Sequence, residues 1–310
     1  MQKMEAVDAS CCQNWDLSGE FLIWFASEQP SSNWANGTTT TIKNLNFTDN
    51  VDIAIASFDW DYGFRVGLGH TMEHDRWDTQ FYWAWFRTTA ESRIPTVNSL
   101  LNTVYLEFDG SFFLHGDDLD GKGARINWSL LFNMLDWELG RSCPISQALS
   151  MRPFIGIKGG WIHQNILAKV DLITSIGTEK LENHFWGIGP SGGLNTTWTM
   201  GRVSSHSFNL FGDFSTATMW GNWHVTDVYN NGSDVLPVKI DMTSLGSLML
   251  RGFLGIGWDT YTCGGYRIAA TLGYEMQIWF NQLRIPTLQQ LPLHGDLTLQ
   301  GGTFNARLDF

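Results

Sequence analysis

The sequence predicts an all-β protein, a transmembrane antiparallel up-and-down β-barrel of about ten strands, with twelve strands as the alternative count. Three observations lead to this fold class. Long segments alternate between apolar residues and small or polar ones, and the connections between these segments alternate in length. No segment approaches the roughly 18 consecutive apolar residues of a membrane helix. We expect residues 1–14 to form a periplasmic N-terminal segment and residues 15–310 to form the barrel.

The composition agrees with strands rather than helices. The 310 residues include 16 Trp, 20 Phe and 32 Gly but 8 Pro, and 16% are charged, against about 25% in ordinary globular domains. The net charge of -12 argues against a nucleic-acid partner, because phosphate binding needs a basic surface. Residues 1–10 lack the apolar core of a secretory signal, so we expect that an export signal was removed or lies upstream.

The clearest predicted strand runs from Phe58 to Gly69, where six apolar residues alternate with Asp, Gly and Arg. Small residues with a few charges suit a barrel lumen better than a solvent-exposed sheet face. Twelve residues extend over about 40 Å, enough for a tilted membrane crossing. In the segment 124–141 the phase of the alternation changes between Met134 and Leu135, which we interpret as a β-bulge. Further predicted strands begin near Leu17 and lie at 77–88, 151–166, 185–200, 208–220, 248–259, 267–280 and 297–310.

The lengths of the connections predict which side of the membrane each one occupies. Short connections are expected at 71–76, 142–150, 201–207 and 261–265. Long ones are expected at 28–50, 89–123, 168–182, 221–237 and 281–294. Short periplasmic turns and long outer loops are the layout of outer-membrane barrels. A strand-like stretch at 104–115 within the second long loop is the origin of the twelve-strand alternative.

The chain ends in a strand with apolar residues on one face. Soluble domains usually fray at their termini, so exposed aromatic residues in the final strand favour a lipid environment. Bacterial outer-membrane barrels commonly end in a strand that closes on a terminal Phe, and this ending resembles theirs. We therefore expect the barrel-assembly machinery to recognise a C-terminal signal that consists of Phe304, Leu308 and Phe310.

Several motifs resemble those of a known family. The segments 58–69 (FDWDYGFRVGLG), 135–141 (LDWELGR), 152–156 (RPFIG) and 297–301 (LTLQG) look like the pore-forming outer-membrane proteins similar to the Legionella major outer membrane protein. Members also occur in chlamydia-related bacteria, and the resemblance runs from about Trp15 to Phe310. It implies an integral outer-membrane porin for the passive diffusion of ions and small solutes, abundant in the envelope, with no catalytic residues, metal or cofactor. Outer-membrane lipid and lipopolysaccharide are the expected partners.

Charged residues on the face opposite the apolar one are expected to line the pore. Rings of charge set which ions pass through a channel. The alternative is that the charges neutralise one another and fill a narrow lumen, which would leave a non-conducting structural or adhesive barrel. The predicted pore-lining residues are Glu20, Asp59, Asp61, Arg65, Asp136, Glu138, Lys158, Asp213, Arg251, Arg267 and Glu275.

The four cysteines all fall on the predicted periplasmic side. Cys11 and Cys12 precede the first strand, whereas Cys143 and Cys263 lie in short connections. Because the periplasm is oxidising, our hypothesis is that they form disulfides with other copies of the chain or with cysteine-rich envelope proteins. Free or locally paired thiols are the alternative. A purely monomeric band on non-reducing gels of native envelopes would reject the cross-link.

A barrel enzyme is the least supported class. The acidic and histidine groups at 70–75 and the Ser-Ser-His-Ser sequence at 204–207 fall in short turns, away from the outer rim where substrates arrive. His115 and the nearby Asp117, Asp118 and Asp120 lie in a long loop, for which we favour an ordinary acidic loop over a cation site. We therefore predict no catalytic residue and no metal site.

Overall fold

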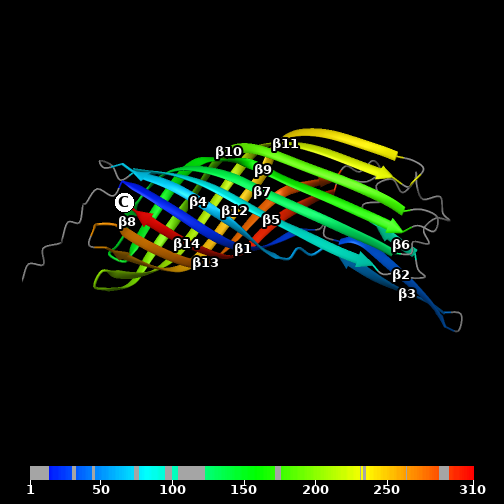
Figure 1. The fold of residues 1–310 in the computed structure, drawn as a ribbon, viewed down its shortest axis with the longest axis horizontal. Coiled ribbons are helices and arrows are strands. Elements are labelled where there is room, and N and C mark those ends of the chain that lie inside the picture. The colour runs from blue at the N-terminus through cyan, green and yellow to red at the C-terminus, as the bar shows by residue number, and fades with distance from the viewer. Residues whose placement is uncertain are drawn as a thin grey trace, which may run out of the picture.

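The computed structural model describes residues 14–29, 33–43, 46–72, 77–94, 100–103, 123–171, 176–230, 232, 235–262, 264–285 and 293–310. Ten antiparallel strands form a closed barrel in which each strand pairs with its neighbours along the chain (Figure 1), so the predicted fold class and strand count are confirmed. No helix among the described residues is long and apolar enough to cross a membrane. The barrel strands are β1 (Trp15–Gln29), β4 (Trp60–Thr71), β5 (Trp77–Ile94), β7 (Gly123–Arg141), β9 (Leu149–Asp171), β10 (Ile176–Val203), β11 (His206–Asn230), β12 (Val235–Tyr261), β13 (Arg267–Ile285) and β14 (Leu293–Asp309).

The first and last strands close the barrel. β1 pairs with β14 over its whole length, and the backbones of Trp15 and Phe310 exchange two hydrogen bonds of 3.0 and 2.8 Å. The side chains of Phe304, Leu308 and Phe310 are exposed on the outside. Their role as an assembly signal stays a prediction.

Four shorter strands lie outside this ring. β2 (Asn33–Lys43), β3 (Asn46–Ile55) and β6 (Leu100–Thr103) form a separate sheet beyond one end of the barrel (Figure 1), and β8 (Cys143–Pro144) pairs with the start of β9. The prediction of an irregular loop over 28–50 was therefore wrong. The Thr-rich sequence of β2 suits a strand because Thr is β-branched. The strand-like stretch 104–115 lies outside the described residues.

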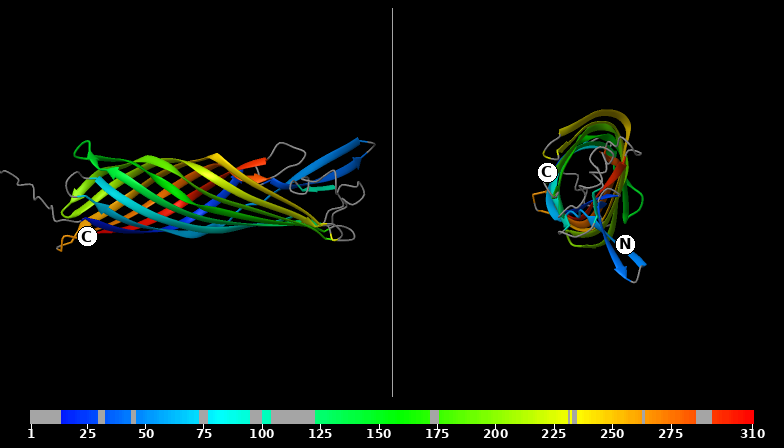
Figure 2. Two further views of the ribbon diagram at one scale, coloured as in Figure 1. Left: turned by 90° about the horizontal axis from the view of Figure 1, so that it is seen from above. Right: turned by 90° about the vertical axis from the view of Figure 1, so that its right-hand side faces the viewer.

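The strands extend well past the predicted boundaries at the end opposite the termini. β10 has 28 residues, β11 has 25 and β12 has 27, so most of the predicted loops at 168–182 and 221–237 are strand. A strand of 28 residues extends over about 90 Å, far more than a tilted crossing of the roughly 25 Å apolar band requires. The barrel therefore continues beyond the membrane, with the oval cross-section seen in Figure 2.

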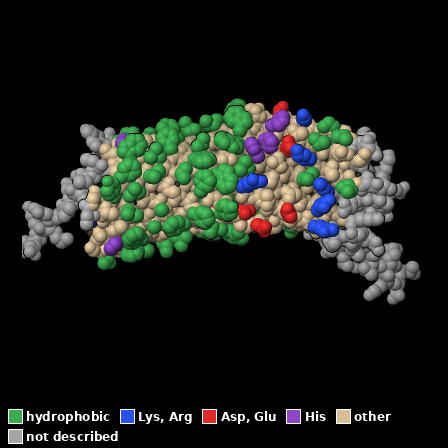
Figure 3. Space-filling model, in the orientation of Figure 1, with side chains coloured by type: hydrophobic (Ala, Val, Ile, Leu, Met, Phe, Trp, Pro, Cys, Tyr) green, Lys and Arg blue, Asp and Glu red, His purple; other side chains and the backbone are tan. Residues whose placement is uncertain are grey.

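The exterior has two zones along the barrel axis. Apolar side chains cover the part nearest the C-terminus, whereas Lys, Arg, Asp, Glu and His gather toward the other end (Figure 3). We call the first part the membrane half and the second part the outer half. On β9 the boundary lies between Trp161 and His163, and on β10 between His184 and Trp186.

The interior has the opposite character in each half. In the membrane half the inward side chains are mostly polar or charged. In the outer half most of them form one buried apolar cluster. Its members are Leu22, Trp24, Ala26, Ala56, Phe58, Ala84, Phe86, Ala90, Ala124, Ile126, Trp128, Leu130, Phe132, Met134, Ile162, Ile166, Leu181, Phe185, Ala217, Met219, Trp223, Val225, Met249, Trp279, Leu283, Leu297 and Leu299.

β7 shows that one regular strand serves both halves. Its inward residues are apolar up to Met134, and the next two, Asp136 and Glu138, are acidic. The strand pairs with β5 and β9 without any shift in register. The predicted bulge between Met134 and Leu135 was therefore wrong, because the backbone keeps its phase while the surroundings of its two faces exchange.

A real irregularity precedes β4. Phe58 forms an isolated bridge with Ala90, although the register of Gly63 with Phe86 would place Phe58 opposite Glu91. One extra residue therefore lies between the two pairs. As a result Phe58 points inward, with its ring 5.3 Å from that of Trp128, and Asp59 is exposed, the reverse of the predicted faces.

Candidate functional site: the barrel lumen

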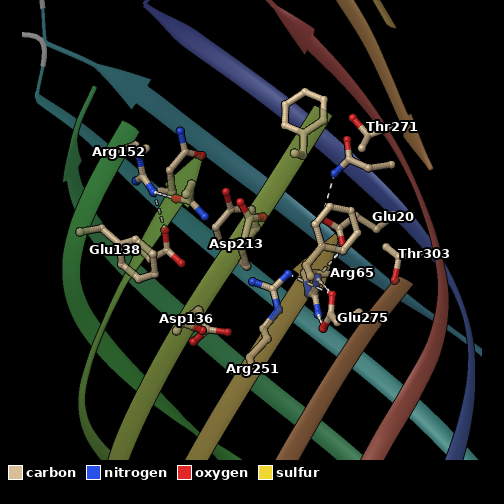
Figure 4. A pocket seen from close by; sticks show the side chains of 18 of the residues that line it. Glu20, Arg65, Asp136, Glu138, Arg152, Asp213, Arg251, Thr271, Glu275 and Thr303 are labelled. Carbon is tan, nitrogen blue, oxygen red and sulfur yellow. Dashed lines mark hydrogen bonds and ion pairs between the residues drawn. The ribbon is translucent and has the colours of Figure 1, made fainter. Parts of the chain in front are cut away.

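A cavity of about 630 Å³ lies in the lumen of the membrane half. It reaches from Thr71 and Ser142, beside the short turns, to Phe132 and Met134 at the boundary with the outer half. Figure 4 shows acidic and basic side chains that converge on this space from neighbouring strands. Six acidic and six basic residues line it, so their formal charges cancel: Glu20, Asp78, Asp136, Glu138, Asp213, Glu275, Arg65, Arg152, Lys158, Arg251, Arg267 and Arg307.

The innermost charge cluster centres on Glu275, which is fully buried on β13. Arg65 donates to it through Nη2 at 2.7 Å, and Arg251 donates through Nη2 at 2.9 Å. Arg65 also donates through Nη1 to Glu20 at 2.5 Å. The side chains of β1, β4, β12 and β13 are thereby joined in one network, which satisfies charges that would otherwise be costly to bury.

A second network lies on the other wall. Arg152 on β9 donates through Nε to Asp78 at 2.8 Å and through Nη1 to both Glu138 and Asn195, each at 2.8 Å. Lys158 lies six residues further along β9, on the same inward face, and forms an ion pair with Asp136 on β7. The wall of the cavity therefore alternates in sign, and each cation lies within reach of a carboxylate.

A third network lies at the end of the barrel that carries the termini. Arg267 contacts Asp259 at 3.4 Å and Asp309 at 3.0 Å. Arg307 contacts Asp309 at 2.6 Å and Asp16 at 3.2 Å. These pairs link β1, β12, β13 and β14. They therefore also connect the first and last strands, where the barrel closes.

The structure places nine of the eleven predicted pore-lining residues on the cavity wall: Glu20, Arg65, Asp136, Glu138, Lys158, Asp213, Arg251, Arg267 and Glu275. Asp59 and Asp61 do not line it. Asp61 pairs in register with Trp24, above the cavity. Sequence reasoning missed Asp78, Arg152 and Arg307, although each has the inward phase of a predicted strand.

An aromatic cluster of four buried residues closes the lumen above the cavity. It consists of Trp24, Phe86, Phe132 and Trp279. The ring centroids of Trp24 and Phe86 are 5.6 Å apart, and those of Phe132 and Trp279 are also 5.6 Å apart. Four strands separate β7 from β13 in either direction around the ring. The contact between Phe132 and Trp279 therefore spans the full width of the lumen.

Acidic side chains are also buried inside the outer half, beyond the membrane. Glu28 accepts a hydrogen bond of 2.5 Å from Gln164 on the far wall, and burial raises the pKa of Glu28 to about 8. Glu179 and Asp227 are hydrogen-bonded to each other, and burial raises the pKa of both, for Asp227 to about 7. A neutral carboxyl group is cheaper to bury than a charged one, so this region favours the protonated forms.

The other residues considered in the sequence lie apart from the lumen. Cys143 is free and half-buried in β8; Cys11, Cys12 and Cys263 are outside the described residues, so the disulfides stay a prediction. The acidic loop at 115–120 and residues 73–76 also lie outside the described residues, so what the sequence predicts for them stays a prediction. His70 packs against the ring of Trp15 at 4.5 Å. In the part of the chain that the structure describes, no three His, Cys, Asp or Glu side chains are grouped to hold a metal ion.

A closed barrel with an apolar exterior band and a charged lumen defines an outer-membrane β-barrel protein. The family model described as the Legionella pneumophila major outer membrane protein precursor matches residues 9–310. Because this match covers nearly the whole chain, the chain belongs to that family and is an integral protein of the bacterial outer membrane. Among curated proteins, none matches the sequence.

Solved structures with similar folds are distant. The outer membrane protease OmpT from Escherichia coli is 8% identical, with a TM-score of 0.47 and 96% of both chains covered. A Pseudomonas aeruginosa FadL homologue is 8% identical, with a TM-score of 0.31 and 96% and 90% covered. The P. putida toluene transporter TodX is 8% identical, with a TM-score of 0.28 and 96% and 90% covered. Similarity at this level gives no evidence about the activity of this protein.

Proposed function

We propose that this protein is a porin whose lumen passes ions and small solutes, and that the conformation described here is its closed state. The observation that carries the proposal is the charged cavity of about 630 Å³ in the membrane half. Buried ion pairs add little net stability compared with apolar packing. A barrel that served only as an envelope component would therefore gain little stability from twelve charged side chains around a cavity.

The aromatic cluster is the gate in this proposal. The cavity ends at Phe132, and the contact of Phe132 with Trp279 closes the lumen. Apolar constrictions gate channels by excluding water, and Arg65 lies directly below, with its guanidinium 5.7 Å from the ring of Trp24. Opening would require these rings to separate and water to enter from the charged side.

Conductance of the refolded full-length protein in planar bilayers tests the gate. We expect rare, brief steps from the wild type and an open probability at least about tenfold higher for Phe132→Ala and Trp279→Ala, because a smaller side chain leaves a hydrated gap. Phe214→Ala is the matched control, since Phe214 is exposed on the lipid-facing exterior of β11. The proposal would be contradicted if neither gate variant conducts although heat-modifiable gel mobility shows that both are folded.

The balance of charge in the lumen bears on selectivity. Six acidic and six basic residues line the cavity, so we expect a reversal potential close to zero in a salt gradient. Asp136→Asn leaves Lys158 without its partner and is expected to shift the reversal potential toward anion preference. An unchanged reversal potential in open channels of this variant would place the conduction path elsewhere.

The second candidate function is a non-conducting structural barrel. The buried apolar cluster favours it, because the cluster extends along the described outer half and is not confined to one constriction. This function predicts that neither wild type nor any gate variant conducts. The same recordings therefore distinguish the two functions.

A further inference from the structure

A basic patch lies on the exterior of the outer half. It consists of Arg87, Arg93, Arg125, Lys169 and Lys180, which point outward from β5, β7, β9 and β10. Figure 3 shows Lys and Arg side chains gathered toward this end of the barrel. Among the outward side chains described on these four strands, only Glu91 and Glu182 are acidic. Such a patch is notable because the whole chain has a net charge of -12.

Three members of the patch form a row of like charges. Arg93 pairs directly with Arg125, and Arg125 pairs directly with Lys169. Side chains directly opposite on antiparallel strands lie about 5 Å apart, and like charges at such positions are destabilising. The ion pair described on this face joins Lys180 to Glu182; no described carboxylate pairs with the three cations of the row. An anionic partner would remove this repulsion.

The members of the patch lie at different heights above the membrane boundary. Outward-facing Trp85 and Trp161 mark that boundary, as tryptophan does at membrane interfaces. Arg87 follows Trp85 by two residues, whereas Arg93 and Lys169 lie eight residues beyond Trp85 and Trp161. Eight residues of a strand tilted by about 45° rise about 19 Å. This height exceeds the headgroup layer of an ordinary phospholipid, which adds only about 5–8 Å on each side.

We propose that the basic patch binds a phosphorylated glycolipid of the outer leaflet, of the lipopolysaccharide type. Arg87 contacts phosphate at the membrane surface, and the row of Arg93, Arg125 and Lys169 contacts anionic groups carried higher on the saccharide. Arginine suits this role because its planar guanidinium donates two parallel hydrogen bonds to a phosphate. A molecule with charges at both heights fits the vertical spread of the patch, and the proposal does not depend on whether the barrel conducts.

Binding of fluorescent lipopolysaccharide to the refolded full-length protein in phosphatidylcholine nanodiscs tests the proposal. We expect Arg125→Gln to weaken binding about tenfold, because it removes the central guanidinium of the row. Combined Arg93→Gln, Arg125→Gln and Lys169→Gln is expected to weaken it at least about fiftyfold. The control is Lys239→Gln, which removes one exposed cation from β12, outside the patch, and should change binding less than about twofold.

The competitors identify the source of the anion. We expect dephosphorylated lipopolysaccharide, phosphatidylglycerol and inorganic phosphate each to compete at least about tenfold more weakly than the intact glycolipid. Equal competition by phosphatidylglycerol or by inorganic phosphate would overturn the assignment to a glycolipid. Wild-type affinity in the triple variant, with heat-modifiable mobility showing that it is folded, would overturn the assignment to this patch.

Discussion

Most of the ten barrel strands run through both the membrane half and the outer half, and their two faces have opposite polarity in the two halves. In the membrane half apolar residues such as Leu254, with 63% of its surface exposed, face outward, while Glu275 is fully buried inside. In the outer half Trp128 is fully buried inside, while Arg125 on the same strand is exposed. Strand alternation therefore defines two faces, whereas the solvent around each segment decides which face is apolar.

The largest expected effect is loss of packing in the outer half. Trp128→Ala should lower the free energy of unfolding by about 3–5 kcal/mol, because a fully buried ring is removed and the hydrogen bond from its Nε1 to Gln164 is lost. Trp186→Ala, on the lipid-facing exterior, should cost clearly less because 54% of that side chain is exposed. Urea unfolding of both variants in vesicles measures the difference; equal losses would mean that the outer half has no apolar core.

A charge on the exterior should be tolerated in only one half. Leu254→Arg places a cation on the lipid-facing surface and should cost about 2–4 kcal/mol. Thr226→Arg places one on the exterior of the outer half, where we expect a change within about 0.5 kcal/mol. Folding yield into vesicles and urea midpoints provide the test. A similar penalty at both positions would place the outer half inside the membrane.

The buried acids predict that the outer half is more stable at pH 5 than at pH 8.5. Burial raises the folded-state pKa of Glu28 from its ordinary value of 4.5 to about 8, and it raises the pKa values of Glu179 and Asp227 as well. The folded state therefore binds more protons, so its stability is present at low pH and is lost as the pH rises from about 4.5 through 8.

Hydrogen exchange of β1 and β10 at both pH values measures this dependence. We expect a loss of about 1–3 kcal/mol over the interval and a smaller loss in Glu28→Gln, which is neutral at every pH. Faster exchange at pH 5 than at pH 8.5, after correction for the intrinsic rate, would contradict the predicted sign.

The smallest expected effect concerns ion pairs on the exterior of the outer half. His224 and Asp241 contact each other across β11 and β12, yet their side chains are 56% and 74% exposed. Exposed pairs contribute about 0–1 kcal/mol, so Asp241→Asn should change the free energy of unfolding by less than about 0.5 kcal/mol in urea titrations. A loss above about 2 kcal/mol would show that this surface is covered rather than solvated.

The alternation and the closing strand were predictable from the sequence because the period of two holds over long stretches of the barrel strands, although register shifts at Thr199/Gly201, Met219/Trp220 and Trp279/Leu283 interrupt it. Most of the charged lumen followed from the same phase. The aromatic cluster above the cavity did not follow. Trp24 and Trp279 have the inward phase of their strands, but a pattern of two faces carries no information about where along the strand the solvent changes. For the same reason the change at Met134 was interpreted as a bulge, although β7 is regular.

The extent of the outer half could not be predicted from the sequence either. Segments 168–182 and 221–237 are polar on their outward face, which is typical of loops as well as of strands beyond the membrane. Their continuation as β9, β10, β11 and β12 depends on pairing between long strands, and a single segment does not reveal that pairing.

The most direct test of the two-zone interior compares Ser215→Cys with Ala217→Cys in a variant whose four native cysteines are replaced by serine. Both residues are inward on β11, but Ser215 lines the charged cavity and Ala217 belongs to the buried apolar cluster. Refolded protein in vesicles is treated with a small water-soluble thiol reagent. We expect rapid labelling at position 215 and labelling at least about tenfold slower at position 217, because the apolar cluster excludes water. Equal labelling at both positions would show that water reaches both zones of the interior alike.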